Sequence, residues 1–111
     1  MTYVFDIDGT ICHSIDGDYD NATPIQDRID KINYLHEQGN KIIFQTARGM
    51  GRSKNSTAYA HTAFYEFTKN QLRKWGLDYH KLVMGKPSYD LFIDDRAINN
   101  EDWYKQEGLS V

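Results

Sequence analysis

Several features that mark secreted, membrane-bound or nucleic-acid-binding proteins are missing from this sequence. Cys12 is the single cysteine, so no disulfide can form within the chain. No run of about 18 apolar residues is present, which excludes a membrane-spanning helix. The N-terminus has no basic segment followed by an apolar stretch, so we expect no secretory signal. The net charge of -3 lacks the basic excess of a nucleic-acid-binding surface. We therefore expect a cytoplasmic protein that binds neither membranes nor nucleic acid.

The residues that are present fit one folded domain. The chain has 111 residues, of which 40% are hydrophobic, which is enough for a core and too much for a disordered chain. We predict a single domain over residues 1–111. Eight tyrosines and two tryptophans either pack in that core or form a contact between subunits, so a homo-oligomer stays open as a partner.

Hydrophobic periodicity predicts alternating strands and helices. Short apolar runs indicate strands, and apolar residues at helical spacing indicate helices. Thr23 and Pro24 have the residue types of a helix N-cap and first helical position, and Gly39 those of a helix end. Strands are expected at 2–7, 41–46, 80–84 and 89–93, with helices at 24–38 and 58–75 and a short helix or loop at 99–106. This order predicts an α/β fold with a doubly wound, Rossmann-like, mostly parallel sheet and no large cap domain.

Chemically capable side chains follow the carboxyl ends of these strands, where ligands bind in open α/β sheets. They are Asp6, Asp8, Thr46, Lys86, Asp94 and Asp95. Carboxylates that are crowded together need a cation, and oxygen ligands of this kind suit Mg²⁺. A phosphate ester then fits the open position, because the metal ion and a lysine share its negative charge. The sequence therefore predicts Mg²⁺ as cofactor and a small-molecule phosphate ester as ligand.

Asp6 and Asp8 are two residues apart, so a regular strand would place both carboxylates on one face. One carboxylate can then attack phosphorus while the other donates a proton to the leaving oxygen. Gly9 allows a sharp turn after the strand, and the backbone N–H groups of the turn that includes Thr10 are available to phosphate oxygens.

These motifs resemble those of the haloacid dehalogenase superfamily. Residues 6–10 (Asp-Ile-Asp-Gly-Thr) are similar to its first motif, and Thr46 after an apolar strand is similar to its second. Lys86 is similar to the third motif, and residues 93–95 (Ile-Asp-Asp) to the fourth. All four occur in order over residues 4–95, so the resemblance covers most of the chain.

The resemblance implies a role for each matching residue. Asp6 would be the nucleophile that forms an aspartyl-phosphate, and Asp8 the general acid and base that later activates water. Thr46 would bind the phosphoryl oxygens, and Lys86 would stabilise the transferring charge. The metal ligands would be Asp6, the Asp8 carbonyl, Asp94 and, through water, Asp95. Such a covalent route divides one difficult displacement into two easier ones.

A finer resemblance is to small, nearly capless members of this superfamily that act as capsule-biosynthesis phosphatases. It is carried by residues 5–12, 46–48 and 85–99. About 35 residues separate the first two motifs, which leaves no room for a large insertion. The resemblance implies a phosphorylated sugar, or a sugar-linked metabolite of surface polysaccharide synthesis, as substrate.

Other residues near these motifs have two interpretations each. Arg48, next to Ala47 at a strand end, either binds the substrate phosphate or forms a structural ion pair. His13 lies just after the first motif and is either a site residue or a loop residue. Arg52 belongs to the loop 49–57, which either closes over a substrate or is an ordinary surface loop. Asp95 is either a ligand or a local partner of Arg96.

The sequence predicts a Mg²⁺-dependent phosphomonoester hydrolase. One alternative is a phosphotransferase or mutase of the same superfamily. Mutases usually need a cap to shield the intermediate from water, and this chain has almost no room for one. Another is a receiver-like regulatory module, since receivers also use an acidic cluster, a threonine and a lysine around an aspartyl-phosphate. Asp8 argues against a receiver, because it supplies an acid and base two residues after the nucleophile.

Overall fold

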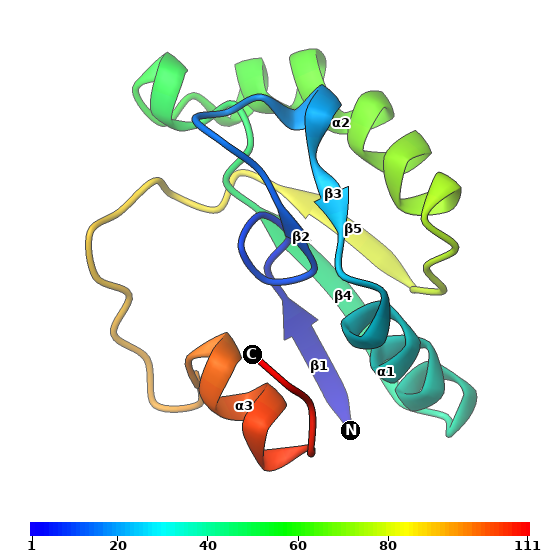
Figure 1. Ribbon diagram of the computed structural model, residues 1–111. Helices are drawn as coiled ribbons and strands as arrows, with labels where there is room; N and C mark the ends of the chain where they lie inside the picture. The colour runs from blue at the N-terminus through cyan, green and yellow to red at the C-terminus, as the bar shows by residue number, and fades with distance from the viewer.

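Three short apolar runs form a parallel sheet at the centre of the molecule (Figure 1). The computed structural model describes residues 1–111. The strands lie in the order β1 (Thr2–Phe5), β4 (Lys41–Thr46) and β5 (Lys81–Met84). Their registers are parallel, with Phe5 beside Phe44 and Thr46 beside Met84. The carboxyl ends of all three strands therefore meet at one edge of the sheet.

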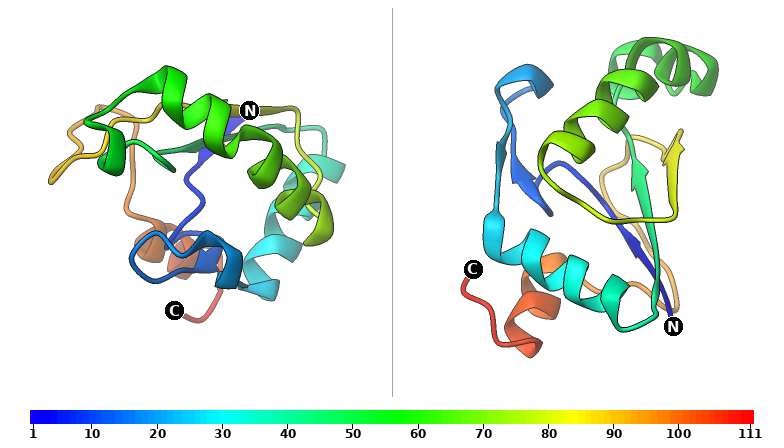
Figure 2. Two further views of the ribbon diagram at one scale, coloured as in Figure 1. Left: turned by 90° about the horizontal axis from the view of Figure 1, so that it is seen from above. Right: turned by 90° about the vertical axis from the view of Figure 1, so that its right-hand side faces the viewer.

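Three helices flank this sheet (Figures 1 and 2). They are α1 (Gln26–Glu37), α2 (Thr57–Lys74) and α3 (Asn100–Gln106). The core combines Phe5, Phe44 and Leu82 from the sheet with Ile29 from α1 and Leu72 from α2. The strand residues that alternate with these buried ones are less covered, and Val4 on β1 is 58% exposed.

A small antiparallel pair follows the first strand. It consists of β2 (Cys12–His13) and β3 (Thr23–Pro24), with the 3-10 turn η1 (Tyr19–Asn21) between them. The prediction that Thr23 and Pro24 start the helix is wrong, because both residues pair with β2 and α1 begins later, after Ile25. A second 3-10 turn, η2 (Gly51–Ser53), lies in the loop before α2.

The prediction of a strand at residues 89–93 is wrong for the single chain. Residues 87–98 form an exposed segment that arcs away from the sheet between β5 and α3 (Figure 1). Only Gly85 to Ser88 separate β5 from residue 89, and a parallel crossover needs about a dozen residues or more. The apolar residues at 91–93 therefore find no place in the sheet of their own chain.

The predicted fold class is confirmed. The chain is a small α/β protein with a parallel sheet flanked by helices and no additional domain. The strand at 41–46 has the predicted bounds, and the helices end as predicted at Gly39 and Gly76, whose φ angles are +90° and +77°. None of the helices has the length and hydrophobicity needed to cross a membrane.

Candidate functional site

A shallow cavity of about 240 Å³ lies beyond the carboxyl end of β1. Its lining comes from the turn after β1, from the loop that leads to η1 and from the end of β4. The lining residues are Asp6, Asp8, Ser14, Gly17, Tyr19, Ala47 and Arg48. Four of them, Asp6, Asp8, Ala47 and Arg48, belong to the predicted site, so the fold brings the first two predicted motifs together.

Asp6 lies beside the ammonium group of Lys86. Its Oδ1 atom lies 3.7 Å from Lys86 Nζ, and its Oδ2 atom accepts a 3.4 Å hydrogen bond from Thr10 Oγ1. Burial raises the pKa of Asp6 above its usual value, although the Lys86 ammonium opposes this shift. Lys86 follows β5 and its backbone N–H donates to the Thr46 carbonyl at 3.1 Å. The predicted third motif is thus also part of the site.

Asp8 is bound on both oxygens by one arginine. Arg48 Nε lies 2.9 Å from Asp8 Oδ2, and Arg48 Nη2 lies 3.0 Å from Asp8 Oδ1. Ser14 Oγ also donates to Oδ1 at 3.0 Å. Such a two-point contact is the strong form of an arginine–carboxylate pair. Of the two interpretations of Arg48, the structure has the ion pair.

Arg48 is buried, with 1% of its surface exposed, and it is fixed from several sides. Its Nη1 atom donates to Gln71 Oε1 at 2.6 Å and to Thr68 Oγ1 at 3.3 Å, both on α2. The ring of Tyr19 lies over the guanidinium, 4.6 Å from its carbon atom. The Asp8–Arg48 pair therefore joins the first strand's turn to α2 and to η1.

The turn after β1 is held by backbone contacts. Gly9 has a φ of +81°, which favours glycine, and its N–H donates to the Cys12 carbonyl at 2.9 Å. The N–H groups of Thr10 and Ile11 both donate to the Ile7 carbonyl. In this conformation the N–H groups of Gly9 and Thr10 are already paired, so neither is free for a phosphate oxygen.

Thr46 is buried at the end of β4, with 1% exposure. Its Oγ1 atom accepts a hydrogen bond from the Arg48 N–H at 3.1 Å. Thr46 thus shapes the turn that presents Arg48 to Asp8, and it does not line the cavity itself.

Cys12 lies next to Asp8 and is buried. Burial and the nearby Asp8 charge raise the pKa of its thiol to about 12. A thiol in this state is inert at neutral pH, so Cys12 is a packing residue of the site.

The remaining predicted residues lie apart from the cavity lining. His13 is exposed and pairs with Thr23 in the small sheet. Arg52 donates to the Gly17 carbonyl at 3.2 Å, and its guanidinium lies 4.8 Å from the Phe64 ring, so it ties the loop that follows β2 to α2.

Asp94 and Asp95 lie in the exposed segment, outside the site of their own chain. Asp94 accepts a hydrogen bond from the Arg96 N–H at 2.7 Å, and Asp95 is 4.0 Å from the Arg96 side chain. No group of three or more histidine, cysteine, aspartate or glutamate side chains gathers in a way that could hold a metal ion. The Mg²⁺ ligand set predicted from the sequence is therefore incomplete within one chain.

Ser14, Gly17 and Tyr19 line the cavity and were not predicted from the sequence. Their contacts with Asp8, Arg52 and Arg48 span up to 35 residues of chain. No local pattern marks them, because their place depends on how the loop after β2 folds back.

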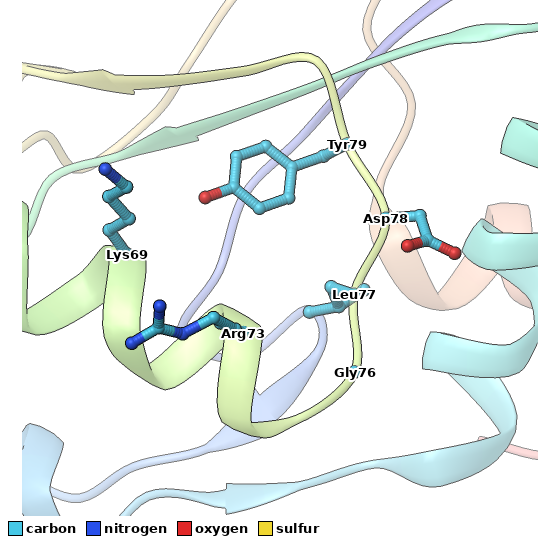
Figure 3. A pocket seen from close by; sticks show the side chains of 6 residues that line it. All are labelled: Lys69, Arg73, Gly76, Leu77, Asp78 and Tyr79. Atoms are coloured by element: carbon cyan, nitrogen blue, oxygen red, sulfur yellow. The ribbon is translucent and has the colours of Figure 1, made fainter.

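A larger cavity of about 330 Å³ lies at the C-terminal end of α2 (Figure 3). It is lined by Lys69, Arg73, Gly76, Leu77, Asp78 and Tyr79. Figure 3 shows that the side chains of Lys69 and Arg73 come from successive turns of α2. This cavity contains none of the predicted motifs, so the smaller acidic cavity is the candidate functional site.

Comparison with known proteins supports the fold. No family model matches the chain, and no curated protein matches it. The crystal structure of a structural-genomics target from Vibrio cholerae is similar, with a TM-score of 0.83 and 27% sequence identity. The match covers 92% of this chain and 85% of that chain. This similarity extends over nearly the whole α/β fold and assigns no activity.

Proposed function

We propose that this chain is a phosphomonoester hydrolase that uses Asp6 as its nucleophile. The observation that carries the proposal is the Asp6–Lys86 pair at the carboxyl edge of a parallel sheet, with Asp8 two residues away. A carboxylate nucleophile beside a fixed ammonium suits a phosphoryl group, whose negative oxygens the ammonium stabilises. The resemblance of the four motifs to the haloacid dehalogenase superfamily supports the same chemistry.

The reaction proceeds in two displacements. A carboxylate oxygen of Asp6 bonds to phosphorus while the bond from phosphorus to the substrate alcohol breaks, and the leaving oxygen takes up a proton. Water then attacks phosphorus, the bond to Asp6 breaks, inorganic phosphate leaves and the proton of the water passes to a base. Lys86 stabilises the charge on the phosphoryl oxygens in both displacements.

Asp8 is the proposed acid and base of these proton transfers. Both of its oxygens contact Arg48 in this conformation, so one contact must lengthen before Asp8 can carry a proton. A phosphate that enters the cavity next to Arg48 offers that guanidinium another anion, which would free one oxygen of Asp8.

Mg²⁺ is the proposed cofactor, and when bound it would neutralise charge on the phosphate. One chain brings together only two of the four expected carboxylates, and one of these two holds Arg48. The residues gathered in one chain do not fit the ion, so no step above is assigned to it.

The proposed substrate is a sugar phosphate or a sugar-linked phosphorylated metabolite of capsular or surface polysaccharide synthesis. The resemblance of residues 85–99 to the small capsule-biosynthesis phosphatases supports this class. The cavity of about 240 Å³ is shallow, so most of a sugar would extend beyond it toward the loops at 13–22 and 49–57.

Phosphate release tests the proposal. The purified protein should release inorganic phosphate from hexose phosphates when Mg²⁺ is present, and Asp6→Asn should abolish turnover. Asp30→Asn is the matched control, because Asp30 is an exposed aspartate on α1 that accepts a hydrogen bond from Gln26. Turnover that persists in Asp6→Asn overturns the nucleophile assignment.

A receiver-like module is the second candidate, and the Asp8–Arg48 pair favours it. A carboxylate that is held by arginine activates water poorly, so an aspartyl-phosphate on Asp6 would persist. Incubation with acetyl phosphate separates the two functions. A phosphorylated form that lasts for many minutes without turnover supports the receiver, and continuous phosphate release supports the hydrolase.

A further inference from the structure

The outer edge of β1 has no partner. The strand pairs with β4 on one side, and the order β1-β4-β5 leaves its other side free. Val4, in the middle of β1, is 58% exposed. A free edge of this kind presents N–H and C=O groups to any extended chain that can reach them.

The segment of residues 87–98 has the complementary properties. None of its N–H or C=O groups takes part in a backbone–backbone hydrogen bond. Leu91 is 76% exposed and Ile93 is 87% exposed, with Phe92 between them at 46%. Large apolar side chains next to unpaired backbone are an interaction surface or an aggregation hazard when they remain uncovered.

The segment and the edge match when they are aligned in parallel. If Asp94 lies beside Asp6, then Phe92 lies beside Val4 and Ile93 beside Phe5. Alternation then puts Ile93 on the core side of the sheet with Phe5, and puts Asp94 on the same side as Asp6. The most exposed apolar residue would thus be buried, and a third carboxylate would enter the site.

A strand that begins at Tyr89 cannot reach this position within its own chain. Met84 lies level with Thr46 at the carboxyl edge, and β5 is on the far side of the sheet from the free edge of β1. Measured from Met84, Tyr89 would have to lie three strand spacings across the sheet, about 14 Å, and about 20 Å back along the strands. The two offsets combine to a distance of roughly 24 Å. The chain from Met84 to Tyr89 spans at most about 18 Å when it is fully extended.

We propose that two copies of this chain exchange the segment, so that residues 89–93 of each add a parallel strand to β1 of the other. Asp94 and Asp95 of each copy then complete the acidic site around Asp6 and Asp8 of the other. The part of this inference that concerns the site rests on the proposed function, whereas the strand exchange does not. Exchange of an identical element is an established route to closed dimers.

The short connection to α3 fits the exchange. Only three residues separate Asp95 from Asn99, the N-cap of α3, so α3 travels with the strand. Its contacts lie close to the site, because Tyr104 donates to the Thr10 carbonyl and Trp103 packs on Phe5. In the exchanged dimer α3 makes these same contacts on the copy that receives the strand.

Cross-linking tests the exchange without any activity assay. Proteins carrying Val4→Cys and Phe92→Cys are mixed after unfolding and refolding together, then treated with a short bismaleimide. A cross-linked dimer containing one of each variant is expected, and buried Cys12 adds little background. Tyr34→Cys, at a 53% exposed position on α1, replaces Val4→Cys in the control mixture. A yield no higher than this control, or an internal link within monomers of the double variant, overturns the exchange.

Mixed variants test whether the site is shared. Asp6→Asn and Asp94→Asn should each be inactive alone, and refolding them together should restore about a quarter of the wild-type activity, because random exchange joins both native carboxylates at one site in four. Full activity of Asp94→Asn alone, or no recovery in the mixture, overturns the sharing. If the wild-type protein releases no phosphate from any ester, the proposed function fails, and the cross-linking result still decides the exchange.

Discussion

Arg48 and Asp8 form a two-point ion pair across 40 residues of sequence, with Nε and Nη2 at 2.9 and 3.0 Å from the two carboxylate oxygens. The arginine side chain has no exposed surface, whereas a quarter of the Asp8 side chain is exposed. Of the two side chains, only the Asp8 carboxylate is therefore accessible from the cavity. Its burial makes it a structural contact, and its place next to Asp6 makes it part of the site.

Replacing Arg48 should destabilise the fold strongly. Arg48→Met leaves Asp8 without its cation and Gln71 without its donor, and loss of one partner of a buried pair costs about 3 kcal/mol or more. Urea unfolding followed by circular dichroism measures the change. Arg73→Met, at an exposed position on α2, the helix of Gln71, should change the free energy of unfolding by less than about 0.5 kcal/mol. Equal effects of the two substitutions would contradict the structural role of Arg48.

The pKa of Asp6 predicts how stability depends on pH. Because burial raises this pKa above 3.8 in the folded state, the folded protein holds the Asp6 proton more tightly than the unfolded chain does. The contribution of protonated Asp6 to the free energy of unfolding is therefore complete below the unfolded pKa of 3.8. This contribution is lost as the pH rises through the pKa of Asp6 in the folded state. Asp6→Asn should thus be more stable than wild type at pH 7 and not at pH 3.5. Thermal melts without divalent ions measure this, and Asp30→Asn, at an exposed position on α1, should show no such difference.

Lys86 should set the acid limb of the activity profile. The ammonium lowers the pKa of Asp6 against the effect of burial, so Lys86→Met should raise that pKa further. The nucleophile must be ionised, and the acid limb of kcat/KM should therefore move to higher pH, together with a lower maximum rate. Lys81→Met, at an exposed position on β5, should leave the profile unchanged. An unshifted limb in Lys86→Met would show that Asp6 ionisation does not control the rate.

The sequence was sufficient for some elements and insufficient for others, for physical reasons. The run at 41–46 was placed correctly because it forms the central strand, in which Ile42 and Phe44 are buried and Ile43 is partly buried. Residues 89–93 are also mostly apolar, yet their pairing depends on a route that the four residues between β5 and Tyr89 cannot provide. The ends of β1 and β4 placed Asp6, Asp8 and Arg48 near one another. The choice between an ion pair and a phosphate contact for Arg48 depends on Thr68 and Gln71, which no nearby motif indicates.

The buried hydroxyl of Tyr104 should contribute modestly to stability. It donates to the Thr10 carbonyl at 2.9 Å, and Arg28 Nη1 donates to the same oxygen at 3.1 Å. Tyr104→Phe removes one donor and leaves the carbonyl paired, so the expected loss is about 1 kcal/mol. Urea unfolding measures it, with Tyr34→Phe on the surface of α1 as control. A loss of about 3 kcal/mol would mean that the hydroxyl also orders the turn at Thr10.

Arg52 offers the sharpest test of whether the loop after β2 takes part in substrate binding. Its guanidinium packs on Phe64 and donates to Gly17, which lines the cavity. Arg52→Ala removes an exposed contact of about 0.5–1 kcal/mol, so the global stability should change little. If the loop orders the bound sugar, KM should rise by a factor of about 2–5 while kcat remains close to wild type. Lys54→Ala, two residues away in an exposed position, should change neither constant. A fall in kcat with constant KM would instead assign Arg52 to the chemical step, through Tyr19 and the Asp8–Arg48 pair.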